Sequence, residues 1–198
     1  FVISGAGRHV TLGGHIHFGG LRENRELISA LDRLIAQPLR SISNNYIRES
    51  HGYGRLGETR VQPHGWEYRA PCSWLSHPRI TKGVLKVAYW LGKRCIMNLT
   101  LDITTQQLCT WVKEQDAEDG KTVQLFYDVI SKMYTSGYKL EQIEVFKAWR
   151  KVPRPQAPIP TSTPTNLAQN QNRIRVSYLW NTEDTRITEI RDSYNQYR

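Results

Sequence analysis

The fold that we expect for this chain follows mainly from one stretch, Gly13-Gly14-His15-Ile16-His17-Phe18-Gly19-Gly20. We interpret residues 8–18 as a β-strand, in which side chains two positions apart point to the same face. His15 and His17 therefore share a face, and the flanking glycines let a ligand approach the backbone. Taken alone, two histidines at this spacing also occur in purely structural strands, and paired glycines also occur in bulges and turns.

A second stretch complements the first: Arg60-Val61-Gln62-Pro63-His64-Gly65-Trp66-Glu67-Tyr68-Arg69-Ala70-Pro71. We interpret residues 64–70 as a strand that Pro71 ends, with Glu67 and Arg69 on one face. A glutamate and an arginine at this spacing also describe an exposed strand with a salt bridge. Together, the two stretches supply two imidazoles, a carboxylate and several guanidiniums, a combination that suits a metal ion holding a phosphate.

Charge is distributed unevenly along the 198 residues, whose formal net charge is +9. Residues 1–80 contain ten arginines and no lysine, all nine lysines follow, and all six histidines lie within residues 1–77. Because arginine binds carboxylate and phosphate groups through two parallel hydrogen bonds, we interpret the first 80 residues as the chemically active part. The net charge favours an anionic partner, although a basic protein without such a partner would carry the same charge.

In this order, the two motifs resemble the phage and bacterial amidoligases of the carboxylate–amine ligase type, relatives of glutamine synthetase and glutamate–cysteine ligase. The resemblance covers about residues 8–75 and extends through the following helices to about residue 150. It implies a ligase that joins a carboxylate to an amine through an acyl-phosphate, at the expense of ATP. It also implies a peptide or amino-acid substrate and Mg²⁺ or Mn²⁺ as the metal.

The resemblance assigns roles to the polar residues of the two strands. His15 and Glu67 would bind the metal, and His17 would face the phosphates of the nucleotide. Arg69 would lie between these phosphates and the substrate carboxylate, as a nucleotide-binding and catalytic residue. Glu58 is a weaker candidate for taking a proton from the amine, and so is His64.

Three further arginines lie where the family places its substrate- and phosphate-binding arginines. Arg48 and Arg55 are expected to bind the substrate carboxylate, and Arg55 and Arg60 to take part in catalysis. In glutamine synthetase an arginine stands two residues before the metal-binding glutamate, whereas Gly65 stands at that position here. The role therefore falls to Arg60, to Arg55 or to neither.

The family's site also uses a Glu-x-Glu pair from strands upstream of the His-x-His strand, and this chain has no such pair there. The chain therefore resembles the C-terminal half of the ligase, and we expect a processed or truncated product. An upstream polypeptide half or another subunit would be the partner that supplies the remaining metal ligands. The alternative is a protein that kept the fold without the activity.

The pattern of apolar residues predicts an α+β fold, and the resemblance makes its antiparallel sheet part of a glutamine-synthetase-like half-barrel with helices on the outer face. We expect a helix over 22–36 that Pro38 ends, a loop over 37–63, and helices over 78–96, 104–115, 120–136 and 140–150. Thr104 or Thr105 caps one of them, and Gly137 closes another. The expected units are 1–151 (catalytic portion), 152–172 (Pro-rich arm) and 173–198 (terminal strand and polar tail).

Two other functions compete with the ligase. The first is a non-catalytic virion protein that docks through its C-terminal arm, with the strand at 173–180 either adding to another chain or returning to its own sheet. The second is a nucleic-acid-binding module, which we do not expect because no such motif is present. The number and spacing of the three cysteines predict a reducing compartment, and the lack of a long apolar window predicts no membrane partner. The resemblance implies that this compartment is the bacterial host cytoplasm or that the protein is associated with the virion.

Overall fold

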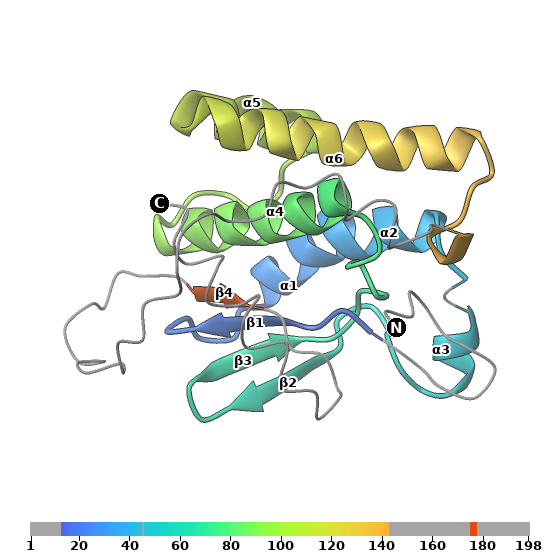
Figure 1. Cartoon of the computed structure of the whole chain (residues 1–198). Helices are drawn as coiled ribbons and strands as arrows, with labels where there is room; N and C mark the ends of the chain where they lie inside the picture. The colour runs from blue at the N-terminus through green and yellow to red at the C-terminus, as the bar shows by residue number, and fades with distance from the viewer. Residues whose placement is uncertain (1–12, 45, 143–174, 178–198) are drawn as a thin grey trace, which may run out of the picture.

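The structure is a computed structural model that describes residues 13–44, 46–142 and 175–177. Four antiparallel strands form one sheet in the order β2-β3-β1-β4, and helices cover one of its faces (Figure 1). The strands are β1 (Ile16–Gly19), β2 (Thr59–Gln62), β3 (Gly65–Tyr68) and β4 (Arg175–Ser177). Helices packed against one side of an antiparallel sheet confirm the predicted α+β class.

The central strands β1 and β3 have one apolar and one polar face. Ile16 pairs with Tyr68 and Phe18 pairs with Trp66, and all four side chains are buried. The rings of Phe18 and Trp66 stack with their centroids 4.6 Å apart. Alternate positions of the same strands therefore turn their side chains to the opposite face, which carries the candidate site.

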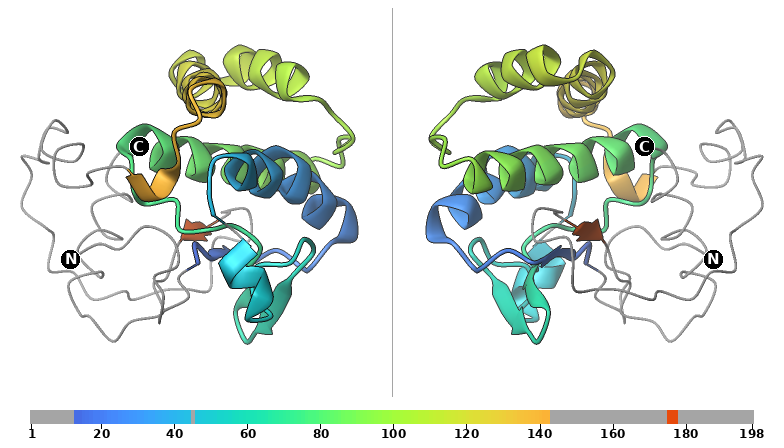
Figure 2. Two further views of the ribbon diagram at one scale, coloured as in Figure 1. Left: turned by 90° about the vertical axis from the view of Figure 1, so that its right-hand side faces the viewer. Right: turned by 90° about the vertical axis from the view of Figure 1, so that its left-hand side faces the viewer.

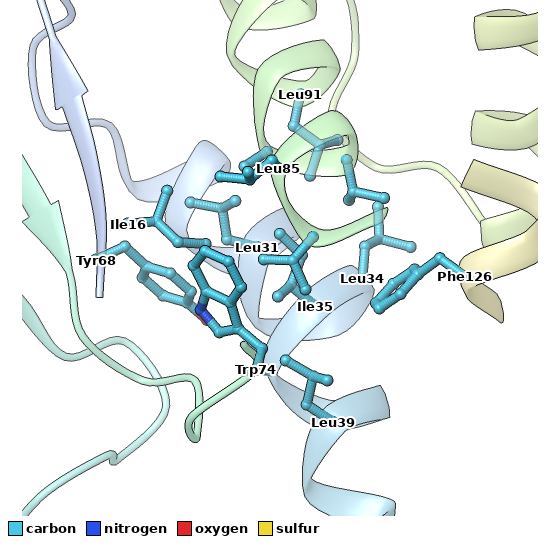
Figure 3. Packing of buried hydrophobic residues seen from close by; sticks show 14 of the residues in the cluster. Ile16, Leu31, Leu34, Ile35, Leu39, Tyr68, Trp74, Leu85, Leu91 and Phe126 are labelled. Atoms are coloured by element: carbon cyan, nitrogen blue, oxygen red, sulfur yellow. The ribbon is translucent and has the colours of Figure 1, made fainter. Parts of the chain in front are cut away.

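The helices form two layers over the apolar face of the sheet (Figures 1 and 2). Nearer the sheet lie α1 (Arg25–Leu31), α2 (Gln37–Ser41) and α4 (Pro78–Ile96), and farther away lie α5 (Thr105–Gln115) and α6 (Ala117–Thr135). Ile16 and Tyr68 of the sheet join Leu31 of α1 in one cluster, which Phe126 reaches from α6 (Figure 3). Burial of each such side chain stabilises the fold by about 1.5–3 kcal/mol, so this interface holds the sheet in place.

The first helix continues through Pro38, and the prediction that this proline ends it is wrong. Between α1 and α2 lies one π-helical segment, Asp32–Ala36, in which the N–H of Gln37 donates to the carbonyl of Asp32. Proline lacks an N–H and its ring clashes with the carbonyl four residues earlier, here Leu34. The hydroxyl of Tyr127 on α6 donates to the Leu34 carbonyl at 2.9 Å. The wider π turn makes room for the ring, and tertiary structure satisfies the orphaned carbonyl.

The predicted loop over 37–63 is also wrong in part, because it contains α2, the short helix α3 (Tyr46–Ser50) and strand β2. Strand β2 has the sequence Thr-Arg-Val-Gln, which lacks a repeated apolar face, and its Val61 side chain is 72% exposed. Such a strand forms because β3 provides hydrogen-bonding partners, and its own sequence gives little sign of it.

The remaining helices follow the predicted pattern closely. Helix α4 covers the expected 78–96, and α5 begins after Thr104, whose hydroxyl and backbone form a capping box with Gln107. Helix α6 starts three residues earlier than predicted because the Asp116 carboxylate caps it, and Gly137 follows it with φ +68°. Of the helix expected over 140–150, the structure describes a 3₁₀ turn, Leu140–Gln142, and the rest lies outside the described residues.

Of the two alternatives for the strand predicted at 173–180, strand β4 shows the return to its own sheet, because residues 175–177 pair with β1 of the same chain. Ser177 lies opposite His17, and Arg175 lies opposite Gly19. The predicted Pro-rich arm, residues 152–172, lies outside the described residues. Within the described part of the chain, no helix combines the length and the apolarity that a bilayer span requires.

Candidate functional site

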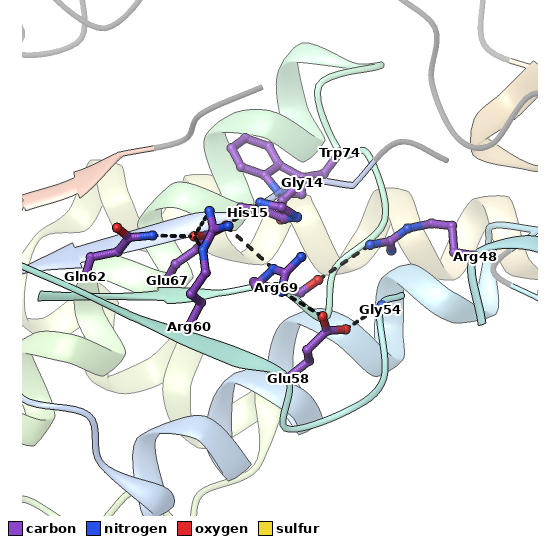
Figure 4. Close-up of polar contacts among 10 residues, drawn as sticks. All are labelled: Gly14, His15, Arg48, Gly54, Glu58, Arg60, Gln62, Glu67, Arg69 and Trp74. Carbon is purple, nitrogen blue, oxygen red and sulfur yellow. Dashed lines mark hydrogen bonds and ion pairs between the residues drawn. The ribbon is translucent and has the colours of Figure 1, made fainter. Parts of the chain in front are cut away.

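The site lies on the sheet face that points away from the helices, where β1, β2 and β3 run side by side (Figure 4). Glu67 on the central strand β3 lies opposite His17 on β1 and opposite Arg60 on β2. Since directly opposite residues of antiparallel strands share a face, these three side chains converge. His15 immediately precedes β1 and Arg69 immediately follows β3, two positions from His17 and Glu67, and their side chains lie on the same face.

The Glu67 carboxylate is the centre of this cluster and is fully buried. Its Oε2 accepts hydrogen bonds from Arg60, whose Nε lies at 2.8 Å and whose Nη2 lies at 2.7 Å, and from Gln62 Nε2 at 3.2 Å. Its Oε1 lies 2.5 Å from His15 Nδ1 and 3.8 Å from Arg69 Nε. Each oxygen therefore has its own set of neighbours, and cationic groups surround the carboxylate.

The neighbouring charges and the burial of the site determine the protonation states of Glu67 and His15. Burial by itself would raise the pKa of Glu67, but His15 and the hydrogen bond from Arg60 outweigh it and hold this pKa below its usual value. The pKa of His15 is lowered from 6.5 to about 4: burial is the largest cause, Glu67 partly offsets it, and the charge of Arg69 adds to the decrease. At neutral pH the site therefore contains an ionised carboxylate beside a neutral imidazole, the forms in which both groups bind metals.

Several buried polar atoms of this face have no hydrogen-bond partner among the described residues. They are both ring nitrogens of His17 and Nε of Arg69, and Oε1 of Glu67 has no hydrogen bond besides its 2.5 Å contact with His15 Nδ1. His17 is only 6% exposed, and burial also lowers its pKa. A buried polar atom without a hydrogen bond costs about 1–3 kcal/mol, so unsatisfied atoms on one face mark a place where a ligand binds.

Arg48 lies beside the cluster but turns its guanidinium to the main chain. The side chain is 2% exposed, and its Nη1 and Nη2 donate to the carbonyls of Ala70 and Arg69 at 3.3 and 3.5 Å. A Cβ atom at Gly13 would approach Arg48 to 2.5 Å, and one at Gly54 would approach it to 2.8 Å. The two glycines therefore leave the space in which this guanidinium lies.

Gly14 anchors the strand that carries the histidines. Its N–H donates to the Pro71 carbonyl at 3.1 Å, and its own carbonyl accepts from Trp74 Nε1 at 3.0 Å. A Cβ atom at this position would lie 2.1 Å from the Trp74 ring and 2.6 Å from the Cys72 carbonyl. Only glycine fits here, and the resulting contact fixes His15 next to Glu67.

The structure does not bring every predicted residue into the cluster. Arg55 and His64 are exposed, and among the described residues neither side chain forms a hydrogen bond or ion pair with Glu67. Glu58 contacts Arg69, with Oε1 3.2 Å from Nη1. Sequence reasoning missed Gln62, which the recognition of β2 as a strand would have placed on the same face as Arg60.

No group of three or more histidine, cysteine, aspartate or glutamate side chains that could hold a metal ion occurs in the part of the chain that the structure describes. The nearest atoms of His15 and Glu67 are 2.5 Å apart, so the two side chains are in direct contact and would separate slightly to hold one ion between them. The described residues thus offer a pair of ligands.

The family model described as "Phage phiEco32-like COOH.NH2 ligase-type 2" matches residues 5–151. The matched span includes both sequence motifs, strands β1 to β3 and helices α1 to α6. Neither a curated protein nor a solved structure gives a significant match. The chain therefore belongs to the phage phiEco32-like COOH–NH2 ligases of type 2, a family of carboxylate–amine ligases.

Proposed function

We propose that this protein uses ATP to join a peptide or amino-acid carboxylate to an amine through an acyl-phosphate. One observation carries the proposal: on the polar face of the sheet, buried nitrogens of His17 and Arg69 lack hydrogen-bond partners among the described residues, beside a buried Glu67 oxygen whose one close contact is His15. The face thus combines a carboxylate oxygen that suits a cation with an unsatisfied guanidinium nitrogen that suits an anion. A metal-bound phosphate combines both charges.

The residues present fit a divalent metal. A neutral imidazole in contact with an ionised carboxylate forms a mixed nitrogen and oxygen donor pair, which suits Mg²⁺ or, because of the imidazole, Mn²⁺. His15 and Glu67 would hold the ion. When bound, it would neutralise charge on phosphate oxygens during phosphoryl transfer. Further ligands would come from outside the described residues, from an upstream segment or another subunit.

The cationic side chains would orient the anionic groups. Arg69 would lie between the phosphate and the substrate carboxylate, and His17 would face the nucleotide phosphates. Arg60 would act together with Arg69, since 54% of its side chain is exposed while its guanidinium is fixed by Glu67. These groups would stabilise the charge that spreads over the transferred phosphate.

Arg48 and Arg55 would bind the substrate carboxylate in different ways. Arg55 is exposed in the loop before β2 and could close over a bound substrate. Arg48 is buried, and binding a carboxylate would require its guanidinium to release the carbonyl of Arg69 or Ala70. We further propose that the sheet is part of a half-barrel of the glutamine synthetase type, because its polar face lies opposite the helices.

The experiment incubates the full chain with ATP, Mg²⁺ or Mn²⁺ and mixtures of amino acids or peptides, and measures phosphate release. We expect release to require both a carboxylate and an amine, and hydroxylamine to trap the activated acyl group as a hydroxamate. His15→Ala and Glu67→Gln should abolish turnover and weaken Mn²⁺ binding, whereas His51→Ala, in an exposed turn, should do neither. ATP turnover that ignores both co-substrates would overturn the proposal, and a protein that binds no nucleotide would favour the structural virion role.

A further inference from the structure

Arg69 is held in one orientation by neighbours on two sides (Figure 4). On one side its Nη1 lies 3.2 Å from Glu58 Oε1, and on the other its Nε lies 3.8 Å from Glu67 Oε1. The Tyr53 ring faces the guanidinium, with its centroid 5.9 Å from Cζ. The contact with Glu58 is the shortest of these, so Glu58 has the largest influence on the direction of the guanidinium.

Glu58 is itself fixed by the loop that precedes β2. Its Oε2 accepts hydrogen bonds from the backbone N–H groups of Gly54 at 2.7 Å and Arg55 at 3.2 Å. Its backbone N–H donates to the Arg55 carbonyl, and its carbonyl accepts from the N–H of Arg69. The carboxylate therefore connects the loop with Arg69, using one oxygen for each.

The same loop is attached to the helical layer. The N–H of Gly57 donates to Asp32 Oδ1 at 3.0 Å, and the hydroxyl of Tyr68 donates to the same oxygen at 2.5 Å. Asp32 begins the π-helical segment, so the loop is tied to the core as well as to β3. Glu58 thus stands on a supported loop, as a residue that orients another residue must.

We propose that Glu58 is a positioning residue that sets the orientation of Arg69 for an anionic ligand and, through Gly54 and Arg55, sets the pose of the loop that carries Arg55. Both carboxylate oxygens are engaged, one by a guanidinium and the other by two backbone N–H groups, which leaves a poor acceptor for a proton from the amine. The proposal rests on the function assigned to Arg69 above.

Two substitutions distinguish the contact of Glu58 with Arg69 from its contacts with the backbone N–H groups of the loop. In Glu58→Gln, the amide oxygen still accepts from Gly54 and Arg55, but the amide nitrogen faces Arg69 and cannot pair with it. Glu58→Ala removes both connections. The matched control is Glu118→Gln on α6, which loses an exposed ion pair with Lys121 far from the site.

The first readout does not depend on activity. We expect the Arg69 Nε–H resonance to be sharp in the wild type and in Glu118→Gln, and to broaden in both Glu58 variants. Hydrogen exchange at the Gly54 and Arg55 amides should remain slow in Glu58→Gln and accelerate in Glu58→Ala. A wild type without ligase activity would contradict the proposed function, while this readout would still test the positioning of Arg69.

The second readout is steady-state kinetics. Loss of a charge-assisted contact is expected to lower kcat/KM about tenfold in Glu58→Gln, with an unchanged shape of the pH profile. In an Arg69→Lys background the same substitution should have little further effect, because its influence passes through Arg69. Wild-type activity and a sharp Arg69 resonance in Glu58→Gln would overturn the proposal. So would additive effects with Arg69→Lys, or the loss of one limb of the pH profile, which would indicate proton transfer by Glu58.

Discussion

The guanidinium of Arg60 and the carboxylate of Glu67 face each other across β2 and β3, with Nη2 and Nε 2.7 and 2.8 Å from the same oxygen, Oε2. Because both bonds end on Oε2, the other oxygen is left to face His15. One arginine therefore orients the buried carboxylate and also stabilises its charge.

Arg60→Ala is expected to raise the pKa of Glu67, because burial raises this pKa and the hydrogen bond and charge of Arg60, which lower it, are then lost. We expect turnover to fall about tenfold or more, and Arg60→Lys to restore part of it, since lysine keeps the charge but not the two parallel bonds. Titration of the Glu67 carboxyl carbon by NMR measures the shift. An unchanged pKa in Arg60→Ala would contradict the role given to this contact.

Folding stability should depend on His15 between pH 6.5 and about 4. The folded-state pKa of His15 is lowered from 6.5 to about 4, so in this range the unfolded chain binds a proton that the folded chain does not. Its contribution is fully present above pH 6.5 and is lost as the pH falls toward 4, about 3 kcal/mol in total. Urea unfolding across this range should show a shallower dependence in His15→Gln, and equal slopes would show that His15 is not buried in the neutral form.

Gly14→Ala should destabilise the protein by about 3 kcal/mol, the upper range for an overpacked core. The added methyl would lie 2.1 Å from the Trp74 ring, so the strand carrying His15 must move. Gly83→Ala is the matched comparison, because its Cβ would lie 2.2 Å from Phe126 in the helical layers, away from the site. At temperatures where both variants are folded, only Gly14→Ala should weaken Mn²⁺ binding. Equal binding by both would show that Gly14 has only a packing role.

Tyr127→Phe should cost about 1 kcal/mol, since it removes the hydrogen bond to the Leu34 carbonyl. In a Pro38→Ala background the loss should be smaller, because the new N–H at position 38 can donate to that same carbonyl. Thermal unfolding of the four proteins of this double-mutant cycle measures the coupling. Additive effects would mean that the hydroxyl does not compensate for the proline.

Part of this protein could be predicted from its sequence because the deciding interactions are local. The apolar period of residues 78–96 specifies α4, and the Thr104 hydroxyl specifies the start of α5 through a bond three residues away. Alternation in the two motifs placed His15 and Glu67 on the faces of strands. Recognition of the family followed from the order of these motifs, and the match over residues 5–151 confirms it.

The local elements, the faces of β1 and β3 and the family can therefore be inferred from the residue pattern. The path of the helix through Pro38 depends on a distant contact, because the compensating hydroxyl comes from Tyr127, 93 positions away. Distant contacts also make residues 59–62 a strand, bring Arg60 and Gln62 to one oxygen of Glu67, and pair residues 175–177 with β1. Strand pairing and the satisfaction of buried polar groups depend on partners distant in the chain, so no local pattern records them.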